Sequence, residues 1–281
     1  MSSIEVKYLR VGHCRHLECI AARGGDFKMI DFPALCGLIR HPQWGWILFD
    51  TGYSDHFYHA TEHLPQSLYR IALPITLAEN EKLLVQLHAM GIGAEDINLV
   101  IVSHYHGDHI AGLKDFPNAR FIASRKDTNA IQQLVNKPWR ATLQGILPAL
   151  LPTDYFKRLS YADDYKTKAL PKWMQPFSEG FDILGDASLL LITLAGHSQD
   201  MLGLLITDAT GRPVFMAADA CWSLNACKEG RLPAALARIA SDNSRKYQST
   251  FMSLGELARR EPSLAILPSH CTHSWEQFNH G

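Results

Sequence analysis

The sequence predicts a mixed α/β fold whose sheets are buried on both faces. Several short runs of almost continuous apolar residues are typical of strands that are covered on both sides. These runs form two groups that flank a stretch of helical periodicity. The composition, 47% hydrophobic and 20% charged over 281 residues, can fill a sizeable core. We expect one domain over residues 1–281, with a helix-rich insertion at about 127–181.

The first part of the chain is expected to begin with strands. The first strand is predicted at Ile4–Val11. A hairpin is predicted at Ala34–His41 and Trp44–Asp50, because these two apolar runs are separated by the turn residues Pro42 and Gln43. The stretch 53–74 is rich in aromatic residues and histidine and shows no clear period. We expect it to be irregular.

A helix and a buried strand follow. Thr76 and Glu79 match a capping box, and apolar residues then recur at helical spacing up to Gly91, which predicts the end of the helix. Asn98–Ser103 predicts a short buried strand that leads directly into a histidine-rich segment. Another strand is expected at Ala119–Ser124.

The second part of the chain alternates between the two element types. The apolar residues of Trp139–Leu150 fall on one face of a single predicted helix, which could wall a channel, pack in the core or form a dimer face. A helix-rich stretch is expected at Pro233–Arg260. The predicted strands are Ser188–Thr193, Met201–Thr207, Pro213–Ala218 and Ser263–Leu267.

Charge and cysteine usage narrow the possible partners and compartment. The net charge is −1, from 27 basic and 28 acidic residues, and no long basic run is present, so we expect neither nucleic acid nor an anionic membrane as a partner. No signal peptide or run of about 18 apolar residues occurs, so no membrane span is expected. Six cysteines without a C-x-x-C pair indicate a reducing compartment, and we expect the cytoplasm.

The strongest chemical signal is the cluster His104-x-His106-x-Asp108-His109. It follows a strand, in which residues i and i+2 point the same way, so His104 and His106 can converge on one cation. Gly107 permits a change of direction, after which Asp108 and His109 can face a second site. Imidazole and carboxylate donors suit zinc, or iron, manganese or cobalt.

Further donors stand at the ends of later predicted strands. His197, Asp219 and His270 each follow an apolar run, as a site at one edge of a sheet requires. Cys221 and Cys271 lie beside two of these donors, and we interpret them as small buried hydrophobic residues rather than ligands.

In these motifs the chain resembles the metallo-β-lactamase superfamily across nearly its whole length. The matching elements, in the order of that family, are Asp50-Thr51-Gly52, the His104-to-His109 cluster, Gly196-His197-Ser198, Asp219 and Pro268-Ser269-His270. The resemblance implies a four-layer αββα sandwich with a helical insertion. It also implies a first metal held by His104, His106 and His197, a second held by Asp108, His109 and His270, Asp219 bridging both, and Asp50 supporting the ligand loops.

Within the superfamily, the chain most resembles N-acyl homoserine lactonases. The similar segments are Gly12-His13-Cys14, Asp31–Leu38 and Met90–Ile97. By this resemblance, a hydroxide that bridges two divalent cations, zinc being the expected metal, would open a lactone or a related ester. Asp108 would carry a proton to the leaving group, and Asp219 would hold both cations. A small apolar or acylated substrate is expected, and a homodimer is possible.

Two departures from that group concern the rim of the site. Trp222 stands where the lactonases carry Tyr three residues after the bridging Asp, and it offers an N–H but no acidic hydroxyl. We therefore take Trp222 as a candidate for the substrate pocket. After His197, Gln199-Asp200 replaces the Pro-Gly pair that is usual in the lactonases.

The sequence leaves alternative functions open. One is hydrolysis of a thioester, as in glyoxalase II, or of a phosphodiester. Another is non-enzymatic binding of a small molecule by a metal-bearing protein.

Overall fold

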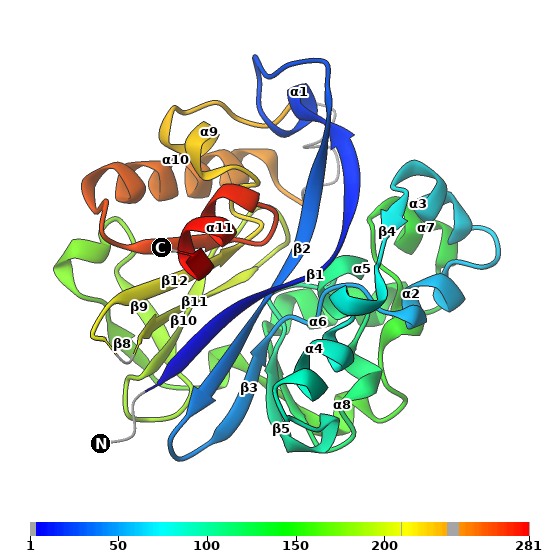
Figure 1. Cartoon of the computed structure of the whole chain (residues 1–281), viewed down its shortest axis with the longest axis horizontal. Coiled ribbons are helices and arrows are strands. Elements are labelled where there is room, and N and C mark those ends of the chain that lie inside the picture. Colours follow the sequence, from blue (N-terminus) through cyan, green and yellow to red (C-terminus); the bar gives the residue numbers. More distant parts are fainter. Residues whose placement is uncertain (1–3, 209, 235–241, 281) are drawn as a thin grey trace. The chain divides into compact units, whose positions relative to one another are not determined.

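The computed structural model describes residues 4–208, 210–234 and 242–280, and it has the mixed α/β class that the sequence predicts (Figure 1). These residues form thirteen strands in two sheets and eleven α-helices. They divide into two compact units, the first drawn from Met1–Arg15 and Pro33–Ser160, the second from His16–Phe32 and Tyr161–Gly281. The single-domain organisation stays a prediction. Across the described ranges, no helix combines the length and apolarity that crossing a bilayer requires.

The first sheet belongs mainly to the first unit. Its strands, in order across the sheet, are β4 (Ile75–Thr76), β1 (Glu5–Leu17), β2 (Met29–His41), β3 (Gly45–Phe49), β5 (Ile97–Ile101), β6 (Arg120–Ala123) and β7 (Leu159–Tyr161). β2 and β3 pair antiparallel, which confirms the predicted hairpin. β3, β5 and β6 run parallel, so their carboxyl ends meet at one edge of the sheet.

The helices of the first unit surround a single apolar core. They are α2 (Asp55–Ala60), α3 (Ser67–Ala72), α4 (Leu83–Ala89), α5 (Gly107–Ile110), α6 (Arg125–Leu134), α7 (Pro138–Leu143) and α8 (Tyr155–Arg158). Phe57, Phe116 and Phe121 are fully buried in this core together with the strand residues Leu48 and Val100. The burial of both helical and strand residues in one cluster fixes the loops that follow β3 and β5.

The second sheet lies in the second unit. Its strands, in order, are β13 (Ala265–Pro268), β12 (Pro213–Ala218), β11 (Leu202–Thr207), β10 (Leu189–Thr193), β9 (Glu179–Asp182) and β8 (Thr167–Ala169). β11 lies between β10 and β12 and pairs antiparallel with both (Figure 1). β12 pairs parallel with β13. β10, β12 and β13 therefore point the same way, and their carboxyl ends share one edge.

Four helices belong to the second unit. They are α1 (Glu18–Ala21), α9 (Leu224–Lys228), α10 (Ser244–Arg260) and α11 (Thr272–His280). α10 begins after Asn243, whose side chain accepts hydrogen bonds from the backbone of Arg245 and Lys246. This helix accounts for the later part of the predicted helix-rich stretch at Pro233–Arg260. Residues 235–241 of that stretch lie outside the described residues.

Two predictions about the first unit are wrong. Thr76 does not begin a helix: it lies in β4 opposite His13 of β1, and α4 starts only at Leu83 after a 3₁₀ turn at Glu79–Glu81. Pairing with a distant strand outweighs the local capping signal there. The stretch 53–74 is not irregular, because α2 and α3 form in it. Ser54 caps α2 by accepting from the backbone N–H of His56.

The predicted single helix Trp139–Leu150 is also wrong. α7 ends at Leu143, and Gly145 follows with φ +69°, a conformation that favours glycine and ends the helix. A separate 3₁₀ turn at Pro148–Leu150 then completes the segment. The wider stretch at about 127–181 is helical only as far as Arg158, and beyond it β7, β8 and β9 alternate with 3₁₀ turns.

Candidate metal centre

The first group of donor residues lies on the loop after β5, residues 103–109, which we call the motif loop. His104 is 1% exposed, and its Nε2 lies 3.1 Å from His106 Nδ1. Two nitrogens bound to one tetrahedral zinc at about 2.1 Å each would be about 3.4 Å apart. The extended backbone before α5 thus places the two imidazoles as the i, i+2 spacing predicts.

Asp50 supports the motif loop, as the resemblance implies. It follows β3, beside the end of β5, and its buried carboxylate accepts from Ser103 N at 2.8 Å, Ser103 Oγ at 2.7 Å and His109 Nδ1 at 2.7 Å. Asp50 has φ +62°, which Asp tolerates better than most residues. The carboxylate keeps the proton of His109 on Nδ1, so Nε2 is the nitrogen that could bind a cation.

Ser103 determines which ring nitrogen of His104 carries the proton. Its only hydroxyl proton goes to Asp50, so Ser103 Oγ accepts from the Nδ1–H of His104, 3.0 Å away. His104, like His109, then carries its proton on Nδ1 and presents Nε2 as a metal donor. The sequence prediction missed this role of Ser103, although its place directly after a buried strand was a signal.

Two glycines let neighbouring segments pack closely on the motif loop. A Cβ on Gly107 would lie 3.0 Å from the rings of Phe57 and Tyr69, so α2 and α3 press against the loop between the two donor pairs. A Cβ on Gly145 would lie 3.3 Å from Cδ2 of His106. Gly107 N also donates to Gly145 O at 3.3 Å. The turn after α7 therefore packs against the His106 ring.

Asp108 and His109 form a second donor pair on the same loop. His109 is 1% exposed, and its Nε2 lies 3.9 Å from Asp108 Oδ2. Both residues belong to α5, and Asp108 retains some exposure, with 12% of its side chain accessible. The Asp108 carboxylate thus lies beside the His109 imidazole and is accessible enough to exchange a proton.

The second group of donor residues comes from three strand ends of the second sheet. His197 follows β10, Asp219 follows β12 and His270 follows β13. Asp219 Oδ2 lies 3.3 Å from His197 Nε2 and 3.1 Å from His270 Nε2. One carboxylate oxygen thus lies close to two imidazole nitrogens, and all three side chains are of types that bind divalent cations.

The backbone around these residues is held by neighbouring segments. Gly196 has φ +125° and lies against the backbone of Tyr247, where no Cβ fits. Asn243 N donates to Gly196 O, and Asp242 N donates to His197 O, both at 3.0 Å. The start of α10 therefore anchors the His197 turn. Ser269 N donates to Ala218 O at 3.0 Å, which ties the ends of β12 and β13 together.

Aromatic side chains surround the second group. Trp222 donates from Nε1 to Asp219 Oδ2 at 3.2 Å, and its ring meets Phe32 edge-on at a centroid distance of 6.1 Å. Phe32 also contacts the rings of His16 and His270. Burial lowers the pKa of His16, which favours the neutral form of this imidazole. The wall beside Asp219 is thus largely apolar.

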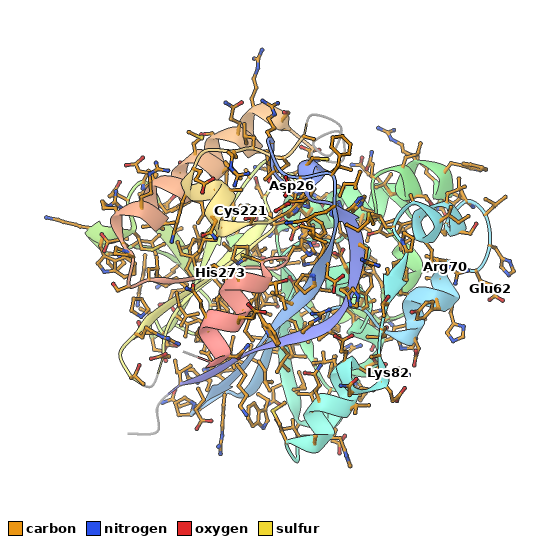
Figure 2. All side chains as sticks on the ribbon, turned by 45° about the horizontal axis from the view of Figure 1, so that its top comes forward. Asp26, Glu62, Arg70, Lys82, Cys221 and His273 are labelled. Atoms are coloured by element: carbon orange, nitrogen blue, oxygen red, sulfur yellow. The ribbon has the colours of Figure 1, made fainter. Side chains whose placement is uncertain are left out.

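The cysteines behave as the sequence predicts. Cys221, which is labelled in Figure 2, is fully buried. Cys271 is 5% exposed. Burial raises the pKa of the Cys221 thiol well above its usual value, so a thiolate is disfavoured there. Cys271 Sγ instead accepts from Ser274 Oγ and Leu224 N.

The donors of both units fit divalent metal ions of the zinc type. Five imidazoles and two carboxylates match the nitrogen and oxygen ligands that zinc takes in hydrolases. Asp50 and Ser103 set the tautomers of two of the imidazoles, an arrangement typical of histidines that bind metal. The structure brings His104, His106, Asp108 and His109 together in the first unit. It brings His197, Asp219 and His270 together in the second.

Comparison with known proteins identifies the family. The profile of the metallo-beta-lactamase superfamily matches residues 29–201. A relative from Azorhizobium caulinodans, the N-acyl homoserine lactonase AttM, is 26% identical over 286 residues, which cover 99% of this chain and 97% of the relative.

Solved structures match the fold. An N-acyl homoserine lactone hydrolase with the product N-hexanoyl-L-homoserine at its catalytic metal centre has a TM-score of 0.70 at 18% identity, covering 99% of this chain and 97% of that one. AidC, a dizinc quorum-quenching lactonase with bound product, has a TM-score of 0.60 at 18% identity, covering 96% and 88%. The predicted fold class is confirmed.

Proposed function

This chain belongs to the metallo-beta-lactamase superfamily of hydrolases, and from that premise we propose that it opens a lactone or a related ester. N-acyl homoserine lactones are the proposed substrate class, because the similarity to the lactonase AttM extends over nearly the full length of both chains. The observation that carries metal dependence is that each unit presents imidazoles beside a carboxylate at strand ends.

We propose that these seven donor residues bind two metal ions. His104, His106 and His197 would hold one cation, Asp108, His109 and His270 the other, and Asp219 both. The 3.1 Å spacing in the first unit and the position of Asp219 between two imidazoles in the second support this assignment. Zinc is the proposed metal, with iron, manganese or cobalt as alternatives. When bound, the cations would activate water and polarise the substrate carbonyl.

Residues of the chain would transfer a proton and orient the metal ligands. Asp108 would move a proton to the leaving-group oxygen, since it is the accessible carboxylate of the motif loop. Asp50 and Ser103 would hold His109 and His104 in the correct tautomer. Asp219 would keep its carboxylate oriented through contacts with His197 and His270.

The setting of the reaction is also part of the proposal. Phe32 and Trp222 offer an apolar wall, which supports a small apolar or acylated substrate. All six cysteines are free thiols, which supports the cytoplasm. Trp139 and Leu143 of α7 are 59% and 80% exposed, which supports a homodimer face.

A substrate screen with ligand variants tests this function. Zinc-loaded protein should open N-acyl homoserine lactones of graded chain length faster than a thioester, a phosphodiester or a β-lactam. His106→Ala and Asp108→Ala should each reduce kcat/KM by more than about 100-fold, since even residues that support metal ligands contribute about 10- to 100-fold. Both variants should keep the unfolding temperature of the apo-protein.

His59→Ala serves as the control, because His59 is an exposed histidine of α2 outside the motif loop. It should keep full activity. Turnover of phosphodiesters alone would refute the lactonase proposal, and unchanged activity of both ligand variants would refute the metal site.

A further inference from the structure

We infer that Trp222 is a positioning residue, whose indole N–H fixes the Asp219 carboxylate for metal binding instead of donating to the substrate. The inference rests on the proposed function, because it concerns the same site. It assigns a separate task to the residue that stands where the lactonases carry a tyrosine.

The contact with Asp219 commits the only hydrogen that the indole can donate. Trp222 Nε1 lies 3.2 Å from Asp219 Oδ2, and an indole has a single N–H and no acceptor. The same oxygen lies 3.1 Å from His270 Nε2. Because the Trp222 N–H points at this carboxylate, it cannot also polarise the carbonyl of a bound ester.

The ring of Trp222 is held in this orientation by its neighbours. It meets Phe32, His197 and His270 edge-on, at interplanar angles of 87°, 81° and 78°. The backbone on both sides is also fixed. Ala220 N donates to Ala217 O, and the Ser223 side chain caps α9 by accepting from Ala226 N. The hydrogen bond therefore needs little additional ordering of the side chain.

A donor fixed in this way affects the metal affinity of the carboxylate. Asp219 is 2% exposed, so water does not replace a lost partner at low cost. Partners that orient a metal ligand contribute about 10- to 100-fold to affinity. The indole thus has two separable properties, the N–H that orients Asp219 and the ring that forms the apolar wall with Phe32.

Three variants of Trp222, with one control, separate these properties. Trp222→Phe keeps an aromatic ring and removes the donor, Trp222→Gln keeps an N–H donor and removes the ring, and Trp222→Leu removes both. Trp139→Phe is the control, since Trp139 is 59% exposed on α7 of the other unit. Zinc affinity of each apo-protein is measured by competition with a chromogenic chelator, and thermal unfolding of the apo-protein checks the fold.

The inference predicts a specific order. Trp222→Phe and Trp222→Leu should bind zinc about 10-fold or more weakly, while Trp222→Gln stays within about threefold of the wild type. Trp139→Phe should match the wild type. Wild-type affinity in Trp222→Phe, or equal losses in Trp222→Gln and Trp222→Leu, would overturn the inference in favour of packing alone. Because zinc affinity is measured without substrate, failure of lactone turnover would refute the proposed function and leave this result intact.

Discussion

The two groups of metal-type donors are built in different ways. In the first unit, four donors lie within six residues on the motif loop, and Asp50 and Ser103 orient two of them by hydrogen bonds. In the second unit, three donors come from three separate strand ends and meet because β10, β12 and β13 point the same way.

The difference shows where each group is vulnerable. The geometry of the first group depends on local hydrogen bonds and on glycines that permit close packing, so single substitutions beside the motif loop should disturb it. The geometry of the second depends on sheet pairing. Substitutions within the strands of that sheet should therefore lower the stability of the protein more than they change the geometry of the donors.

The largest effect on metal binding is expected at the carboxylate that orients the first group. Asp50→Asn should weaken zinc binding by about 10- to 100-fold, because the amide removes the charge that holds the proton of His109 on Nδ1. Asn tolerates the positive φ of this position, so the fold should persist. Chelator competition measures the affinity.

Asp115→Asn provides a matched control for Asp50→Asn. Asp115 Oδ1 also contacts a histidine, His56 Nε2, at 2.8 Å, but neither residue belongs to the proposed ligands. The control should bind zinc like the wild type. An equal loss in both variants would contradict the special role of Asp50.

The larger of two effects on stability is expected at the turn behind His106. Gly145→Ala should lower the free energy of unfolding by about 2–3 kcal/mol, from the cost of φ +69° and from the approach of the new methyl group to the His106 ring. Gly91→Ala is the control, because Gly91 has φ +73° and open space around it. Chemical denaturation of both should give a difference that reports the His106 contact alone. Equal losses would show that the contact has no energetic consequence.

The smallest effect on stability is expected in the second sheet, at Asp182 of β9. Burial acts to raise the pKa of Asp182, but the ion pair with Lys168 and the N–H groups of Ala187 and Gly185 outweigh it and lower the pKa. Asp182→Asn should therefore reduce the free energy of unfolding by about 1 kcal/mol at pH 7 and leave zinc affinity unchanged.

The pH dependence of this effect follows from the direction of the shift. A lowered pKa stabilises the folded state above the unfolded value of about 3.9, and the contribution is lost as the pH falls through the folded value. The difference between wild type and Asp182→Asn should thus shrink below about pH 4. A difference that stays constant down to pH 3 would contradict the assigned cause.

Prediction from sequence succeeded for a continuous apolar run with clear ends, and it failed where a distant strand or a glycine conformation decided the structure. β12 was predicted to the residue as Pro213–Ala218, because an apolar run in a buried strand has clear ends. Thr76 matched a helix cap, yet it pairs with β1, and sequence periodicity carries no information about that partner. The predicted helix at Trp139–Leu150 is wrong because Gly145 adopts a positive φ, which the apolar spacing does not reveal.

The sequence by itself determined the chemistry of the centre. The types and spacing of His104, His106, Asp108 and His109 predict a metal site on any strand-to-loop backbone, because donor chemistry and residue alternation are local properties. Only the tertiary structure decided how the donors are held. Ser103 donates to Asp50 and accepts from His104, and the Trp222 N–H donates to Asp219. These hydrogen bonds depend on which strand ends become neighbours. Strand pairing and packing across the whole chain set those contacts, and no local pattern contains them.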